Sequence, residues 1–294
     1  MRKSKYLILN NFYFNFNNDL TDIEYVKESF KNQNILDLER FNKLISIKEN
    51  QFEFYNLNFL YLPKNIEIMG KYVFLNNQIK ILDLSNCINL KIIKFWAFRN
   101  NQIKQLKLPN NIETLSFASF AYNKIQNLDL SKCLKLKWID TCCFEYNQIK
   151  QLKLPENIEI IGKFAFYINQ IEILDLSNCI KLKNINNFAF EKNQIKQLKL
   201  PKNIEEIRFC AFEYNQIESL DLSNCIKLKE INSNVFYENP LTEIKILNDI
   251  KIDYDNNYDY KDDVWNKFVK YYHKNDKKAG DYKLENNQWQ WYPL

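Results

Sequence analysis

The feature that most constrains the fold is the regular return of L-x-L triplets along most of the chain. The step from Leu128 to Leu152 is 24 residues, the step from Leu152 to Leu174 is 22 residues, and the two steps alternate to give a 46-residue super-repeat. A period of this length that recurs many times is typical of a solenoid, in which each unit buries its apolar face only against its neighbours. The nine units and a closing step begin at Leu36, Leu60, Leu82, Leu106, Leu128, Leu152, Leu174, Leu198, Leu220 and Ile244.

Each unit predicts one short strand followed by a return segment. In Leu152-Lys153-Leu154 alternate side chains point to opposite faces, so the leucines should face the core and the lysine the solvent. Pro155 removes a backbone donor directly after the strand and ends it. Residues 158–166 space their apolar side chains like a short helix or 3₁₀ turn. We therefore predict an α/β repeat solenoid with one short parallel strand and a short helical or irregular return in each 22- or 24-residue repeat.

The repeats divide the chain into three parts. We predict an N-terminal cap in residues 1–35, a solenoid of nine repeats in residues 36–243, and a C-terminal cap of a helix plus a β-hairpin in residues 244–294. Caps are expected because the open ends of a solenoid core need a cover. The apolar residues at helical spacing in the last part are Trp265, Phe268, Val269 and Tyr272.

The placement of asparagine is informative, although its abundance is not. The chain has 43 Asn but only three Gly and six Pro, a skew typical of an AT-rich genome, which supplies Asn freely but not in register. We predict that the periodic Asn side chains form an internal ladder of hydrogen bonds to the backbone; a ligand-binding row of Asn is the alternative. They stand three residues after a Phe or its equivalent, at Asn77, Asn101, Asn123, Asn147, Asn169, Asn193, Asn215 and Asn239.

Charge and hydropathy argue against several classes of protein. With 41 basic and 36 acidic residues the chain lacks the positive excess of a nucleic-acid binder, and we expect no nucleic-acid partner. No run approaches the roughly 18 apolar residues of a membrane span. Asn10 and Asn11 interrupt the short apolar stretch near the N-terminus, so we see no export signal. We therefore expect a soluble, intracellular and cytoplasmic protein.

The residues that usually carry chemistry point to structure. Four of the seven cysteines stand 46 residues apart, without C-x-x-C pairs, and we expect buried free thiols: Cys87, Cys133, Cys179 and Cys225. His273 is the one histidine, and no nucleophile or carboxylate is recognisably arranged around it. We predict no catalytic, cofactor-binding or metal site, hence no enzyme.

The repeat resembles a known family. The segment Leu152–Phe166, which reads L-x-L-P-x-N-I-E-x-I-G-x-x-A-F, is similar to the BspA-like (Treponema pallidum type) leucine-rich repeats, and L-D-L-S-N-C at Leu174–Cys179 resembles related bacterial and giant-virus variants. The AT-rich composition would suit a giant DNA virus. The chain departs from the family in one respect, because the Cys usual after A-F-x-x is Asn here. The resemblance implies a binding or adhesion role and no active site.

The candidate partner surface is the row of outward residues between the paired leucines. The signs of the charges alternate, and parallel strands lie roughly 4.8 Å apart, so we expect each Asp to sit between two Lys. The row either fixes strand register and solubility or forms a concave binding strip for a partner with the reverse pattern. Its members are Tyr61, Asp83, Lys107, Asp129, Lys153, Asp175, Lys199 and Asp221.

We therefore predict a leucine-rich repeat scaffold that binds another protein. A surface adhesin, which would require export, and a structural virion component are the alternatives. The partner's identity and the oligomeric state do not follow from the sequence.

Overall fold

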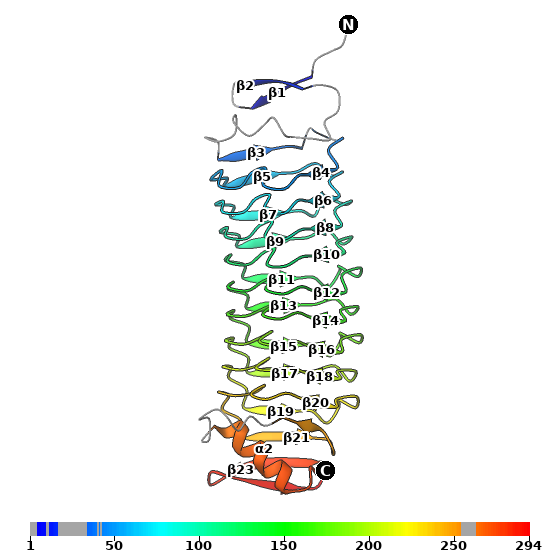
Figure 1. The fold of residues 1–294 in the computed structure, drawn as a ribbon, viewed down its shortest axis with the longest axis vertical. Helices are drawn as coiled ribbons and strands as arrows, with labels where there is room; N and C mark the ends of the chain where they lie inside the picture. Colours follow the sequence, from blue (N-terminus) through cyan, green and yellow to red (C-terminus); the bar gives the residue numbers. More distant parts are fainter. Residues whose placement is uncertain (1–4, 10–11, 17–33, 40, 42, 254–262) are drawn as a thin grey trace.

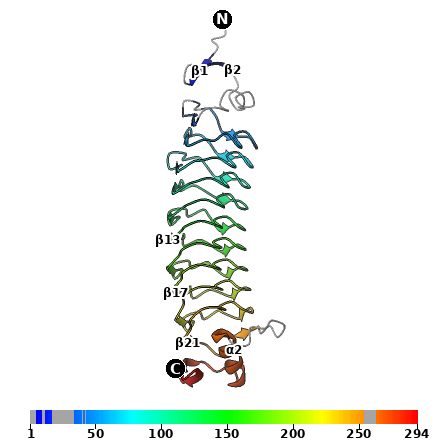
Figure 2. The ribbon, with the colours of Figure 1, turned by 90° about the vertical axis from the view of Figure 1, so that its left-hand side faces the viewer.

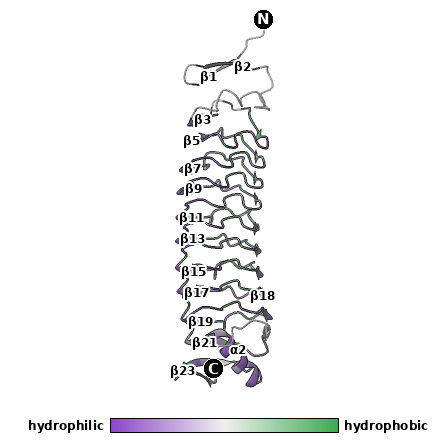
Figure 3. Ribbon diagram, turned by 60° about the vertical axis from the view of Figure 1, so that its left-hand side comes forward, coloured by the Kyte–Doolittle hydropathy of each residue, from purple (hydrophilic) through white to green (hydrophobic). Residues whose placement is uncertain are grey.

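In the computed structural model the chain coils into a column, with one coil for each repeat unit and two strands in most coils (Figure 1). Hydrophobic and hydrophilic residues recur within every coil of the column (Figure 3). The structure describes residues 5–9, 12–16, 34–39, 41, 43–253 and 263–294.

The first strand of each coil is the predicted L-x-L segment. In β13 (Gln151–Lys153), Leu152 faces the core while the two flanking residues are exposed, and the same pattern recurs along the column. This alternation is the period of two expected of a half-buried strand. The other first strands are β3 (Ile35–Asp37), β5 (Phe59–Tyr61), β7 (Ile81–Asp83), β9 (Gln105–Lys107), β11 (Asn127–Asp129), β15 (Ile173–Asp175), β17 (Gln197–Lys199), β19 (Ser219–Asp221) and β21 (Glu243–Ile246).

The return segment is a second strand, so the prediction of a short helical return is wrong. In each coil a strand of two residues pairs in parallel with its neighbours to form one ten-stranded sheet. The N–H groups of Glu159, Ile160 and Gly162 donate to carbonyl oxygens of the preceding coil, and the frequent Ile residues of the segment favour a pleated surface. The strands are β4 (Ser46–Ile47), β6 (Ile68–Met69), β8 (Ile92–Ile93), β10 (Thr114–Leu115), β12 (Trp138–Ile139), β14 (Ile160–Ile161), β16 (Asn184–Ile185), β18 (Glu206–Ile207), β20 (Glu230–Ile231) and β22 (Lys251–Ile252).

The column is nearly straight, so the strand face is flat along the axis and not concave as predicted (Figures 1 and 2). Curvature in a solenoid arises when one side of each coil needs more room than the other, as a helix about 8–10 Å from its neighbour does beside strands about 4.8 Å apart. Here strands stack on both sides of the coil. The two sides therefore advance at the same rate.

A tight turn after each second strand builds a third ladder of hydrogen bonds. Each turn holds two residues with positive φ, two places before and two places after a buried ring, such as Phe164 at 57° and Ile168 at 50° around Phe166. The N–H groups of these three residues all donate to the next coil, at 3.1, 3.1 and 2.8 Å for Phe164, Ile168 and Phe166. A left-handed residue other than Gly costs roughly 1–2 kcal/mol, which these inter-coil bonds help to offset.

The core is a stack of phenylalanine rings beside the predicted asparagine ladder. Successive rings from Phe52 to Phe236 lie 5.2 to 5.6 Å apart between centroids, and all are buried. Asn147 accepts a hydrogen bond from the Ile125 N–H at 3.0 Å and donates to the carbonyl oxygens of Phe120 and Phe144. The same bonds recur in the neighbouring coils, so the prediction of an internal ladder is confirmed.

The C-terminal end of the column is covered by helix α2 (Val264–Lys274) and by the hairpin of β23 (Gly280–Glu285) and β24 (Gln288–Tyr292). Asp263 accepts hydrogen bonds from the Trp265 and Asn266 N–H groups of the helix and, through its other oxygen, from the Glu238 N–H of the last turn. The Trp265 ring packs on Phe236, 5.0 Å between centroids, and ends the phenylalanine stack. The hairpin pairs antiparallel with β21.

At the other end, β1 (Lys5–Leu9) and β2 (Phe12–Phe16) pair antiparallel. The rest of the predicted N-terminal cap, residues 1–35, lies mostly outside the described residues. The division of the chain into a solenoid and two caps stays a prediction.

Candidate functional site

The predicted partner surface lies on the first strands. We call it the first-strand face, and it comprises Tyr61, Asp83, Lys107, Asp129, Lys153, Asp175, Lys199 and Asp221, all of which are exposed. The side chains of Asp83 and Lys107 are 44% and 69% exposed, whereas the leucines on either side of each are largely buried. Alternation within a strand thus places the charges on the solvent side of the sheet.

The aspartates of this face are fixed by the turn that follows each strand. One oxygen of Asp175 accepts hydrogen bonds from the Ser177 N–H at 3.0 Å and the Ser177 hydroxyl at 2.6 Å, and the other lies 3.8 Å from the Lys199 ammonium. At the equivalent Asp129, the hydrogen bond from the Ser131 hydroxyl holds the pKa of the carboxyl below its usual range, against the effect of burial. Each Asp therefore closes a local turn in addition to carrying a surface charge.

Asp129 has a lysine-bearing strand paired on each side, β13 with Lys153 and β9 with Lys107, whereas Asp175 has one. Asp175 lies opposite Lys199 in the pair β15–β17, whereas β13, which carries Lys153, belongs to a separate sheet. The Leu176 N–H donates to the Lys199 carbonyl at 2.8 Å, and the second leucine of each 24-residue unit does the same. Within the described coils, the second leucine of the 22-residue units makes no such bond. The proline that follows it ends the strand and restricts the leucine backbone. The pairing at this step is reduced to one residue pair between β9 and β11 and is absent between β13 and β15 and between β17 and β19.

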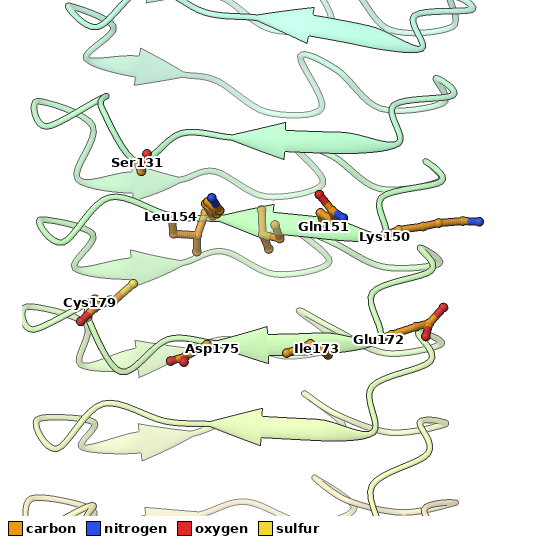
Figure 4. Close-up of a pocket in the computed structure, with 11 residues that line it drawn as sticks. Ser131, Lys150, Gln151, Leu154, Glu172, Ile173, Asp175 and Cys179 are labelled. Atoms are coloured by element: carbon orange, nitrogen blue, oxygen red, sulfur yellow. The ribbon is translucent and has the colours of Figure 1, made fainter.

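Two of these steps hold a groove that runs along the strands. Between β13 and β15 the groove has a volume of about 610 Å³, and Leu152, Leu154 and Ile173 are among the residues that line it. Lys150 and Glu172 lie at one end (Figure 4). A second groove of about 900 Å³ lies between β17 and β19, 46 residues further along the chain. The first-strand face therefore combines alternating charges with apolar grooves at two-coil intervals.

The four periodic cysteines are buried and free, which confirms the expectation for Cys87, Cys133, Cys179 and Cys225. Burial raises the pKa of the Cys133 thiol to about 11, which keeps the thiolate, the reactive form, scarce at neutral pH. The ring nitrogen Nε2 of His273 lies 3.1 Å from the Ile252 carbonyl oxygen and ties the helix to the last coil. Among the residues that the structure describes, no three His, Cys, Asp or Glu side chains are grouped as a metal site would require.

Sequence reasoning missed a row of aromatic side chains outside the phenylalanine stack. Tyr122 and Tyr146 stack at 4.5 Å between centroids, Phe164 and Phe188 stack at 4.6 Å, and Arg99 lies over Tyr122. The sequence does contain a pattern that could have predicted this row, because aromatic residues recur two places before or after the Phe of the phenylalanine stack. In these two pairs the rings cover one another's faces along the column, so we assign the row to the support of the left-handed turns.

The sequence analysis also missed a pair of buried carboxyl groups in the turns that follow the second strands. Glu191 and Glu213 occupy equivalent positions in adjacent coils and are less than 10% exposed. Burial, followed by the charge of Glu213, raises the pKa of Glu191 to about 7, while Lys192 at 3.6 Å acts in the opposite direction. Each of the two glutamates directly follows a Phe of the phenylalanine stack. Glutamate is normally exposed, so residue type alone does not predict this burial.

The family of the chain follows from its repeats. The model of the BspA type leucine-rich repeat region matches residues 24–148 and 137–262, with six copies. The chain belongs to this family. Among curated proteins, none matches the chain.

Three solved leucine-rich repeat structures are similar to this BspA-type chain at low identity. The functional domain of InlJ from Listeria monocytogenes, described as including a cysteine ladder, is 16% identical over 73% of this chain and 48% of that one, with a TM-score of 0.42. A leucine-rich repeat protein from Bacteroides ovatus is 16% identical over 84% and 80% of the two chains, with a TM-score of 0.23. A leucine rich cell surface protein from Faecalibacterium prausnitzii is 14% identical over 74% and 84%, with a TM-score of 0.17.

As expected of repeats of this type, the apolar residues are spread over many short strands. No helix in the described parts of the chain is long and apolar enough to cross a membrane.

Proposed function

We propose that this BspA-type repeat protein is a non-enzymatic scaffold that binds another protein through its first-strand face. The observation that carries the proposal is the combination, on one flat face, of a charge row in fixed register with apolar grooves at two-coil intervals. Membership of a repeat family whose proteins generally act as interaction scaffolds or surface proteins supports it.

The geometry suits recognition of an elongated partner. The aspartates are held by their own turns, so binding would immobilise few of them further, and preorganised groups lose less entropy on association. Charged groups in complementary register favour the right partner and speed the encounter, while apolar side chains in the grooves would supply burial. The partner we expect places apolar side chains at intervals of roughly 10 Å, twice the spacing of parallel strands.

The test is affinity purification of the tagged full-length chain from its native cell or host, with two charge-reversed variants run beside it. The first variant carries Lys107→Glu, Lys153→Glu and Lys199→Glu on the first-strand face. The matched control carries Lys124→Glu, Lys163→Glu and Lys229→Glu, which are exposed lysines off that face. Both change the net charge equally, so a loss of binding in the first variant alone supports the proposal.

A partner retained by the first variant, or lost equally from both, would contradict binding through this face. Fractionation of the same cells shows where the protein is located and so distinguishes the alternatives. Recovery inside the cell supports the intracellular scaffold, whereas recovery at the cell exterior or in purified particles favours the adhesin or the structural virion component.

A further inference from the structure

The loops that follow the first strands form a second surface, which we call the loop edge. It comprises residues 85–89, 131–135, 177–181 and 223–227 of the longer units and residues 63–65, 109–111, 155–157 and 201–203 of the shorter units between them. In each of these longer units the residue after the buried cysteine is aliphatic and largely exposed. The exposed fractions are 56% for Ile88, 50% for Leu134, 49% for Ile180 and 68% for Ile226.

The aliphatic tips are held in place by the neighbouring coils. The side-chain amide of Asn111 donates to the Ile88 carbonyl at 2.9 Å, and Asn157 donates to the Leu134 carbonyl at 3.0 Å. Asn203 makes the same bond to Ile180 at 2.8 Å. Because the column is straight, the tips stand in a line at intervals of two coils, or roughly 10 Å (Figure 1). These exposed side chains are periodic although their exposure adds little to the fold.

The same edge carries a strong excess of positive charge. Glu156 is its one acidic residue, while the chain as a whole has a net charge of only +5. Lys135 lies 3.5 Å from Glu113, and it alone of the edge lysines forms an ion pair with a described residue. The lysines of the edge, all exposed, are Lys64, Lys132, Lys135, Lys181, Lys202 and Lys227.

Separated aliphatic tips among lysines fit a lipid surface better than a protein surface. A protein interface gains most of its energy from a contiguous, desolvated centre, and single exposed tips flanked by lysines supply less of such a centre than the grooves of the first-strand face do. A membrane has no such requirement, because each tip enters the headgroup region separately while the lysines meet anionic lipids. A straight row also contacts a flat surface along its whole length.

We propose that the loop edge docks the protein peripherally on an anionic membrane surface. Ile88, Leu134, Ile180 and Ile226 enter the interface, and the flanking lysines contact the lipid headgroups. The loop edge adjoins the first-strand face, and Ile180, Lys202 and Ile226 also line the groove between β17 and β19. The contact that we propose is with lipid, so this inference does not rest on the proposed scaffold function.

The test is co-sedimentation of the full-length protein with vesicles of phosphatidylcholine alone and of phosphatidylcholine with phosphatidylserine. We expect binding to the anionic vesicles, weakened by salt, and little binding to the neutral ones. Neutralising Lys132, Lys181 and Lys227 to Gln should reduce partitioning about fivefold for each charge removed. Ile180→Asn with Ile226→Asn should also reduce it, because less apolar surface enters the interface.

Matched variants separate the edge from general effects of charge and hydrophobicity. Lys104→Gln, Lys124→Gln and Lys150→Gln remove three exposed lysines elsewhere, and Ile81→Asn with Ile173→Asn removes two aliphatic residues of similar exposure on the first strands. These controls should bind as the parent does. Absence of binding to anionic vesicles overturns the proposal, as does an equal loss in the controls. An acidic protein that occupies the edge, without vesicle binding, overturns it in favour of a protein partner.

Discussion

Single residues of similar chemistry serve opposite purposes in this chain because their surroundings differ. Asp175 is exposed and closes a turn with Ser177, whereas Glu191 lies buried beside a second carboxyl group. The side-chain amide of Asn147 bridges two coils with its oxygen and its nitrogen, whereas Asn110 is exposed on a loop. Three predictions follow from these environments.

The asparagine ladder should be a major source of stability. We expect Asn147→Ala to lower the free energy of unfolding by about 3 kcal/mol, because it leaves the buried Ile125 N–H and the Phe120 and Phe144 carbonyls without their partner. Chemical denaturation measures the change. Asn110→Ala is the control and should cost less than about 0.5 kcal/mol. Equal effects of the two substitutions would refute the ladder's role.

Glu191 should make the protein less stable as the pH rises. Its folded pKa of about 7 lies above the ordinary glutamate value of 4.5, so the folded state binds the proton more tightly and stability falls as the pH rises between these two values. The loss is about 3 kcal/mol, complete above about pH 8. Thermal unfolding across this range should show it, and Glu191→Gln should remove most of the slope. An unchanged slope in the Gln variant would exclude Glu191 as its source.

Asp175 should contribute to stability through its turn more than through its charge. Asp175→Asn keeps an acceptor for the Ser177 N–H and should cost little, whereas Asp175→Ala should cost about 1 kcal/mol. Lys153→Glu, at an exposed lysine whose pair across β11–β13 is with Asp129, should cost no more than about 1 kcal/mol. Denaturant titration of the three variants ranks them; a large cost for Lys153→Glu would show that the charge row itself supports the fold.

At the level of elements, what the sequence predicts depends on whether the signal is local. The first strands follow from the alternation around Leu152, and the outward positions of the first-strand face follow with them. The second strands carry no period because each spans two residues, and their partners are other coils. The break between β13 and β15, which makes the groove, does not follow from Pro155 and the shorter loop alone, because Pro109 stands at the same place in its unit and β9 still pairs with β11.

The turns were also not predicted from the sequence, because residues with positive φ are usually Gly or Asn. Here Ile168 adopts a φ of 50°, although a β-branched side chain is strongly disfavoured there. We expect Ile168→Asn to raise the free energy of unfolding by about 1 kcal/mol through relief of this strain. Ile173→Asn, on an ordinary strand, should not stabilise the protein. Destabilisation by Ile168→Asn in urea would mean that side-chain contacts outweigh the strain.

At the scale of the whole molecule, stability is a sum over coils and their interfaces, so the ends matter more than in a globular domain. The C-terminal end depends on Trp265, which closes the phenylalanine stack, and on Asp263, which joins the last turn to α2. The straightness of the column has the same origin as its second sheet, because equal strand spacing on both sides leaves nothing to bend it.

Loss of the Asp263 junction should loosen the C-terminal coils before the others. We expect Asp263→Ala to cost about 2 kcal/mol, since the N–H groups of Glu238, Trp265 and Asn266 lose their acceptor. Hydrogen exchange should accelerate first around β20 and α2 and leave the coils around β8 protected. Asp263→Asn, which keeps one acceptor oxygen, should lie between the parent and the Ala variant. Uniform acceleration along the chain would contradict end-wise fraying.

The one-way ladder in the turns gives the protein a direction of assembly. Each turn donates its three N–H groups only to the coil made after it, as Phe164, Phe166 and Ile168 do to residues 187–191. If coils form in chain order, each completed coil exposes a row of N–H donors, and the next coil covers that row while exposing its own. Growth of the column resembles the elongation of a filament, with Asp263 as the carboxylate that stops it by accepting the Glu238 N–H in the last row.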